Sequence, residues 1–146
     1  MALPSWWQIA TPHRDIQEGK LSEAIFAADL GDVVFGKAPL EYQDAGIFFQ
    51  KTYLTQGLRN LLENVLSRLN GKKGDPVIQL QTPFGGGKTH ALLTLYHFIK
   101  HKKEIAHLPI FSELGVTKEA KVAVFVGTHA DAISGKTPWG EIAFQL

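Results

Sequence analysis

Residues 76–97 combine a short apolar run, a cluster of glycines and a helical pattern. The run Pro-Val-Ile-Gln-Leu-Gln at 76–81 has the branched and aliphatic composition of a buried strand. It passes into Thr-Pro-Phe-Gly-Gly-Gly-Lys-Thr at 82–89, and apolar residues at helical spacing follow. A strand, a glycine-rich loop and a helix in this order are the context of a phosphate-binding loop. The sequence therefore predicts a nucleoside triphosphate site.

The residues of this loop have separate expected roles. Glycines lack a Cβ, so their N–H groups can turn around an anion, and the helix beginning near Lys88 adds its free N–H groups and positive dipole end. Lys88 is expected to reach the β- and γ-phosphates as the catalytic residue, and the Thr89 hydroxyl to bind magnesium. The predicted cofactors are therefore ATP and magnesium. The predicted nucleotide-binding residues are Thr82, Pro83, Phe84, Gly85, Gly86, Gly87, Lys88, Thr89 and His90.

The loop departs from the general pattern G-x-x-x-x-G-K-S/T at its first position, where Thr82 replaces glycine. Pro83 disfavours the α region for the residue before it, so the strand is expected to continue to Thr82. The alternative is a glycine-rich hairpin or a helix cap that carries Lys-Thr without binding a nucleotide.

Other segments extend the predicted fold. Thr55 and Asn70-Gly71 are suitable ends for an amphipathic helix that contains Leu58, Leu62 and Val65. The run Val122–Val126 predicts a second buried, parallel strand, and another helix begins around Trp139. We therefore expect an α/β fold of the P-loop NTPase type, AAA+-like, with a parallel sheet and flanking helices, incomplete in this chain. The expected division is an N-terminal helical segment at 1–54 and the first part of the ATPase domain at 55–146.

The N-terminal segment carries its own patterns. Phe26, Leu30 and Val33 recur at helical spacing after a suitable cap at Ser22. Trp6-Trp7 is a large apolar pair near the start of the chain, and we expect it to anchor this segment on the core. A surface for a partner protein is the alternative.

The chain lacks the pattern of an apolar strand that ends in an acidic residue, which an ATPase uses to hold magnesium. Hydrolysis needs an acidic residue for magnesium and a group that orients water. Asp131 lies several residues after the second predicted strand, and a turn or cap role is the alternative for it. ATPase activity is therefore expected only in a longer protein.

Three histidines and a lysine run lie in or after the helix that follows the loop. His90, His97 and His101 fall at i, i+7 and i+11, and surface or interfacial positions are expected in preference to metal binding. The lysines at 100, 102 and 103 complement the negative end of the helix, and a nucleic-acid backbone is the alternative contact.

Composition limits the class of protein. The net charge is +1, which argues against a global field for nucleic acid or membranes. No cysteine is present, so disulfides and thiolate metal sites are excluded. No run reaches the roughly 18 apolar residues of a membrane span, and the start lacks the pattern of a signal peptide. A cytoplasmic location is expected.

Four stretches together resemble a family of large prokaryotic predicted AAA+ ATPases of unknown function. They are the loop at 82–90, Phe-Ala-Ala-Asp-Leu at 26–30, Thr-Tyr-Leu-Thr-Gln-Gly-Leu at 52–58 and Trp-Gly-Glu-Ile-Ala at 139–143. The resemblance implies that threonine is the usual residue of the family's loop at position 82. It also implies that this chain is the N-terminal part of a protein several times longer. It implies a place beside DNA methyltransferases and helicases in anti-phage defence. It also suggests that residues 43–55 line an adenine pocket with Tyr53 as a stacking candidate, an ordinary core tyrosine being the alternative.

These patterns lead to two main hypotheses. The first is ATP binding, with hydrolysis in the full-length protein that remodels a DNA- or protein-bound partner in a DNA-linked defence system. The second is a non-hydrolysing, nucleotide-dependent protein-interaction module. A small-molecule kinase is a weaker third, since no set of acceptor-binding basic residues lies near the loop. Expected partners are ATP and methyltransferase- or helicase-type proteins, with DNA contact indirect, no membrane, and oligomerisation left open.

Overall fold

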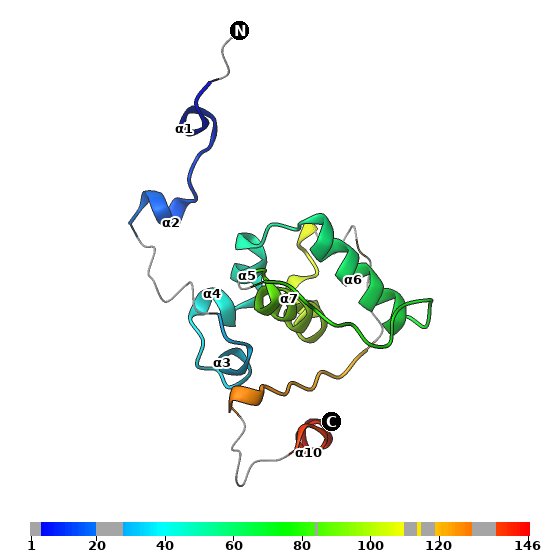
Figure 1. Ribbon diagram of the computed structural model, residues 1–146. Helices are drawn as coiled ribbons and strands as arrows, with labels where there is room; N and C mark the ends of the chain where they lie inside the picture. Colours follow the sequence, from blue (N-terminus) through cyan, green and yellow to red (C-terminus); the bar gives the residue numbers. More distant parts are fainter. Residues whose placement is uncertain (1–3, 20–27, 84, 110–113, 115–118, 130–136) are drawn as a thin grey trace.

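The computed structural model describes residues 4–19, 28–83, 85–109, 114, 119–129 and 137–146, and these form short and medium helices joined by extended segments (Figure 1). None of these described residues lies in a β-strand. The predicted α/β fold with an AAA+-like parallel sheet is therefore wrong for the part of the chain that the structure describes. The α-helices are α1 (Trp6–Ile9), α2 (Arg14–Gln17), α3 (Leu30–Val34), α4 (Leu40–Gln43), α5 (Ala45–Lys51), α6 (Gln56–Leu69), α7 (Lys88–Lys100), α8 (Lys102–Ile105) and α10 (Pro138–Gln145).

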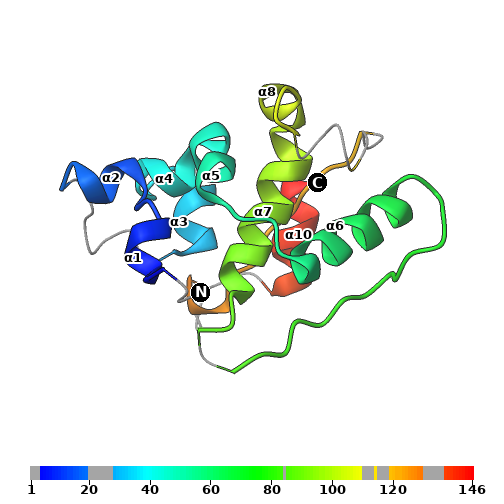
Figure 2. The same cartoon turned by 90° about the horizontal axis from the view of Figure 1, so that it is seen from above.

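The first predicted strand, 76–81, is extended, but no strand of the described part of the chain lies beside it. Val77 is 83% exposed and Ile78 is 38% exposed, whereas a strand of a covered sheet would bury both. No backbone–backbone hydrogen bond joins 76–81 to another described residue. Figure 2 shows the segment between α6 and α7 as a long loop that runs at a distance from the helices. The segment is apolar as predicted, but none of the described residues forms the neighbouring strand that a sheet would need.

The second predicted strand, Val122–Val126, is half-buried and lies along α7 instead of in a sheet (Figure 2). The side-chain amide of Gln145 in α10 occupies the hydrogen-bonding groups of Val124. It accepts from the Val124 N–H at 2.9 Å and donates to the Val124 carbonyl at 2.8 Å. One side-chain amide thus provides the pair of bonds that a neighbouring strand would have supplied.

Helix α6 confirms the predicted amphipathic helix. The Thr55 hydroxyl accepts a hydrogen bond from the Leu58 N–H at 3.3 Å, which caps the start. The helix ends at Asn70, and Gly71 follows with a φ of 74°. Its buried residues are Leu58, Leu62 and Leu66, and the last two pack in the core with residues of other helices; no sheet lies there among the described residues.

Helix α7 passes through the centre of the molecule and contacts α3, α5 and α8 (Figures 1 and 2). Its buried residues are Leu93, Thr94, Tyr96, His97 and Phe98. The core around it also draws on Phe48 and Phe49 of α5 and on Leu62 and Leu66 of α6. Residues from both sides of position 54 therefore share one core, while the predicted division into 1–54 and 55–146 stays a prediction.

Helix α1 stands apart from this core. In Figure 1, α1 lies well away from α5 and α7, and Trp6 and Trp7 are 73% and 65% exposed. Their rings contact each other edge to face, with centroids 5.7 Å apart. The predicted docking of this pair on the core is therefore wrong. An ion pair between Asp15 and Lys51 joins α2 to α5.

The remaining helical predictions have mixed outcomes. The Asp29 carboxylate caps α3 by accepting from the Asp32 N–H at 3.1 Å, and Ser22 and Phe26 lie outside the described residues. The predicted last helix is confirmed as α10, which Thr137 caps. Asp131 also lies outside the described residues. Among the helices of the described residues, none has the length and apolarity that a bilayer crossing requires.

Candidate functional site

The glycine loop turns sharply into α7. Gly85 and Gly87 have φ values of 77° and 75°, in the left-handed region that a side chain disfavours. Gly87 is the N-cap residue of α7, and no side chain of the described residues caps the helix there. Phe84 lies outside the described residues, so its predicted role stays a prediction. Two of the three glycines are thus required by backbone conformation.

Gly86 is required by space instead. A Cβ at this position would lie 2.2 Å from the Thr82 hydroxyl oxygen and 2.5 Å from the Thr82 Cβ. The Gly86 N–H donates to the Pro83 carbonyl at 3.1 Å, which closes the turn. The threonine in place of the usual first glycine therefore packs against the middle glycine of the cluster.

Lys88 folds back across this turn. Its Nζ donates to the Thr82 carbonyl at 2.9 Å, the Thr82 hydroxyl at 3.0 Å and the Pro83 carbonyl at 3.1 Å. These three acceptors are neutral oxygens, so they orient the ammonium group without cancelling its charge. The structure thus brings Lys88, Thr82 and Pro83 together, while the predicted contact of Lys88 with phosphates stays a prediction.

The first turn of α7 supplies further donors. The first backbone bond of the helix runs from the Ala91 N–H to the Gly87 carbonyl at 2.9 Å. The helix therefore has no internal acceptor for the N–H groups of Lys88, Thr89 and His90, which precede that bond. Together with the dipole of a 13-residue helix and the Lys88 ammonium, they form a positive, half-buried group of donors suited to an anion. Thr89 is half-buried in this turn.

His90 points from the first turn of α7 toward α5. Its Nε2 lies 3.2 Å from the Thr52 hydroxyl oxygen, and its ring lies on that of Phe48 with centroids 4.8 Å apart. Burial lowers the pKa of the His90 imidazole. His90 therefore contacts protein groups on α5, while its predicted contact with a nucleotide stays a prediction.

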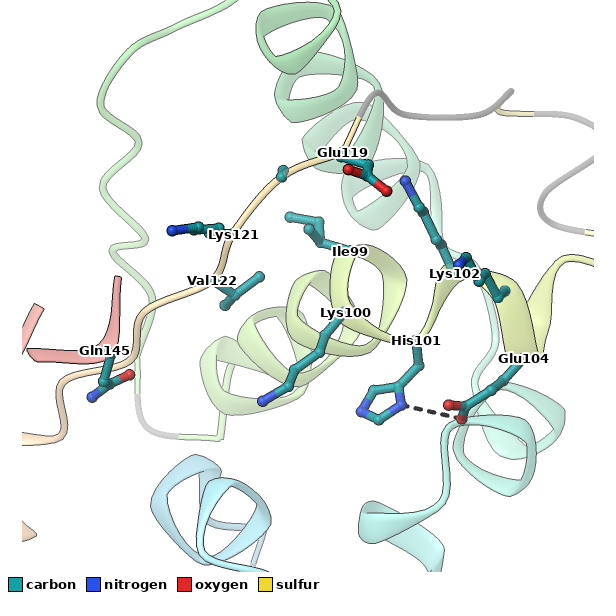
Figure 3. Close-up of a pocket in the computed structure, with 11 residues that line it drawn as sticks. Ile99, Lys100, His101, Lys102, Glu104, Glu119, Lys121, Val122 and Gln145 are labelled. Atoms are coloured by element: carbon teal, nitrogen blue, oxygen red, sulfur yellow. Dashed lines mark hydrogen bonds and ion pairs between the residues drawn. The ribbon is translucent and has the colours of Figure 1, made fainter.

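The opposite end of α7 borders a cavity of about 750 Å³ lined by lysines, glutamates and apolar side chains (Figure 3). His101 bonds Glu104 at 3.1 Å, the Lys100 Nζ lies 5.1 Å from the centre of the Tyr96 ring, and Lys121 donates to the Leu146 carbonyl. These groups have partners within the protein, and the position of Lys100 at the end of α7 fits the predicted complement to the helix dipole.

The histidines of α7 do not share a metal site. His97 is completely buried, which contradicts the expected surface or interfacial position, and its Nε2 lies 2.7 Å from the Tyr42 carbonyl oxygen. Across the described residues, no three or more histidine, aspartate or glutamate side chains are grouped to hold a metal ion. The predicted magnesium contact of Thr89 stays a prediction.

Sequence reasoning missed the part that α5 plays in this site. Thr52 and Phe48 contact His90 although they precede it by 38 and 42 residues, and no local spacing in the sequence predicts such a contact. The expectation that residues 43–55 line an adenine pocket stays a prediction. Tyr53 is 83% exposed, so the alternative of an ordinary core tyrosine is wrong.

These features define a helical domain in which a glycine turn, a lysine and the open start of one central helix form a candidate anion site. The chain belongs to a family of unknown function: residues 11–125 match the family model described as the DUF499 N-terminal domain. No curated protein and no solved structure matches the chain.

Proposed function

We propose that the loop Thr82–Thr89 and the first turn of α7 bind the phosphates of ATP as its magnesium complex. The observation that carries this proposal is the position of Lys88. Its ammonium is held by three neutral oxygens across the glycine turn, beside the uncapped start of α7. A phosphate at this place would gain the lysine charge and the free N–H groups of the helix together.

The geometry of the loop supports the proposal without any sheet. Gly85 and Gly87 provide the left-handed turns, and Gly86 allows Thr82 to approach. In this arrangement Lys88 would contact the outer phosphates, and the Thr89 hydroxyl would bind the magnesium ion that accompanies them.

The test is the dissociation constant of Mg-ATP for the chain and for Lys88→Ala. A charge-assisted contact contributes about 1.5–3 kcal/mol, so the variant is expected to bind roughly ten- to a hundredfold more weakly. Lys73→Ala is the matched control, because Lys73 lies in an exposed turn after α6. An unchanged dissociation constant in a folded Lys88→Ala variant would exclude this assignment.

We infer further that ATP is hydrolysed in a longer protein that contains this domain. The resemblance of the loop and three other stretches to predicted AAA+ ATPases supports this inference, and it also implies the link to DNA methyltransferases and anti-phage defence. Such a protein would use hydrolysis to remodel a DNA- or protein-bound partner. Release of inorganic phosphate by the longer protein, lost on Lys88→Ala, is the measurement that tests it.

A second candidate is a nucleotide-dependent interaction module that does not hydrolyse ATP. The exposed Trp6–Trp7 pair favours it, since two large aromatic rings in solvent are suited to contact another protein. Tight Mg-ATP binding without phosphate release by the longer protein would favour this candidate over the ATPase.

A further inference from the structure

Thr52 lies at the C-terminal end of α5, directly opposite the first turn of α7. Its hydroxyl donates to the Phe48 carbonyl at 2.7 Å. A hydroxyl has one hydrogen, so its contact with His90 at 3.2 Å places the donor on the histidine Nε2. The Thr52 hydroxyl therefore fixes both the tautomer and the direction of the His90 ring.

The same ring is held from a second side by α5. The Phe48 ring lies 4.8 Å from it at an angle of 33°. His90 is the third residue of α7, immediately after Lys88 and Thr89, so restraint of its side chain restrains the turn that carries both of them. The contact reaches the loop from outside, because Thr52 is 38 residues earlier in the chain.

We propose that Thr52 is a positioning residue for the glycine loop, acting through the ring of His90. The proposal rests on the proposed function, since the loop that it positions is the ATP-binding one. Thr52 holds the first turn of α7 against α5, so the N–H groups of Lys88 and Thr89 keep one direction toward the phosphates. A preorganised site binds more tightly because less motion is lost on binding.

Four variants of the chain test this role. Thr52→Val removes the hydroxyl at nearly constant shape, and Thr52→Ser restores it. His90→Ala removes the ring, alone and together with Thr52→Val. Thr94→Val is the matched control, since the buried Thr94 hydroxyl donates its hydrogen bond to the His90 carbonyl within α7.

The measurements are the dissociation constant of Mg-ATP and the hydrogen-exchange rate of the Ala91 amide, which bonds Gly87 at the start of α7. We expect Thr52→Val to weaken binding about two- to tenfold and to speed the exchange, and Thr52→Ser to recover both. The double variant should bind no more weakly than His90→Ala alone, because the two residues act as one unit. Thr94→Val should retain wild-type values for both.

The outcomes distinguish the role of Thr52 from the binding of ATP by the loop. Wild-type binding and exchange in a folded Thr52→Val variant, or additive losses in the double variant, would overturn the role of Thr52 and leave ATP binding intact. A wild-type chain that does not bind Mg-ATP would overturn the proposed function and this inference with it.

Discussion

His97 of α7 donates a hydrogen bond of 2.7 Å from its Nε2 to the main-chain carbonyl of Tyr42 in α4. The histidine is completely buried, and its ring also lies against Phe48, 5.2 Å between centroids. With the proton on Nε2, the neutral ring presents a lone pair at Nδ1, and that atom has no hydrogen-bond partner among the residues that the structure describes. A second proton on this ring would be buried without an acceptor.

The first prediction is that the protein loses stability as the pH falls. Burial is the largest cause that lowers the pKa of His97 below its ordinary value of 6.5. The nearby His101 lowers it too, while the bond to Tyr42 and the charges of Asp44 and Glu104 act in the opposite direction. Between the folded pKa and 6.5 the unfolded chain binds more protons, so the free energy of unfolding falls as the pH drops through 6.5.

Urea denaturation from about pH 8 to about pH 5 measures this slope. Burial lowers the pKa of His90 as well, so part of the slope belongs to that residue. The variant His97→Gln should therefore show a smaller, not an absent, loss of stability below pH 6.5. An identical slope in His97→Gln would contradict the assignment to His97.

The second prediction concerns Gly74, where the loop after α6 packs on that helix. A Cβ at Gly74 would lie 2.6 Å from the Asn64 carbonyl oxygen and 2.8 Å from the Arg68 nitrogen, both of them backbone atoms. The adjacent Asp75 is fixed there by two hydrogen bonds with the Asn64 side chain, at 2.6 and 2.8 Å. Gly74→Ala should destabilise the fold by about 1–3 kcal/mol, since backbone must shift.

Gly57 in the first turn of α6 is the matched control for that substitution. A Cβ there meets no atom within 4 Å, so Gly57→Ala should be neutral or stabilise by up to about 1 kcal/mol through helix propensity. Thermal unfolding of both variants tests the pair. Equal unfolding midpoints for Gly74→Ala and Gly57→Ala would show that the loop accommodates the added Cβ without loss of stability.

The third prediction is that Gly86→Ala disables the loop and that a change at Thr82 restores it in part. The added Cβ would lie 2.2 Å from the Thr82 hydroxyl oxygen, so the turn must open. The hydrogen bond of Lys88 to that hydroxyl would then break. We expect Mg-ATP binding to weaken at least about tenfold. The double variant Thr82→Gly/Gly86→Ala removes that clash and should recover a measurable part of the affinity.

Thr82→Gly alone separates the clash from the loss of a ligand to Lys88. It removes one of the three acceptors of the lysine, the hydroxyl, and leaves the two carbonyls. Its affinity for Mg-ATP should stay within a few-fold of the wild type. If the double variant binds Mg-ATP no more tightly than Gly86→Ala does, contact with Thr82 is not the reason for glycine at position 86.

The sequence predicted well those features that depend on near neighbours. Thr55 caps α6 as expected, a helix begins near Trp139, and the glycine cluster leads into α7 with the left-handed backbone that glycine permits. Each of these depends on residues within a few positions, where propensity and capping act directly.

Features that depend on distant partners were not predicted. A strand needs a neighbour, and the composition of 76–81 cannot show whether one lies beside it. In Val122–Val126 the neighbour is the side chain of Gln145, which no periodicity indicates. The burial of His97 escaped the apolar pattern for the same reason, since its acceptor belongs to Tyr42, 55 residues away.

The exposed run between α6 and α7 has a consequence for handling the protein. An extended chain with free backbone groups and an 83% exposed valine fits the cleft of an endoprotease that prefers aliphatic residues, so limited proteolysis should nick the chain first at 76–80. Leu62 and Leu66 before the nick share a core with Leu93 and Phe98 after it. The two pieces would therefore migrate together in native chromatography and separate only in denaturant.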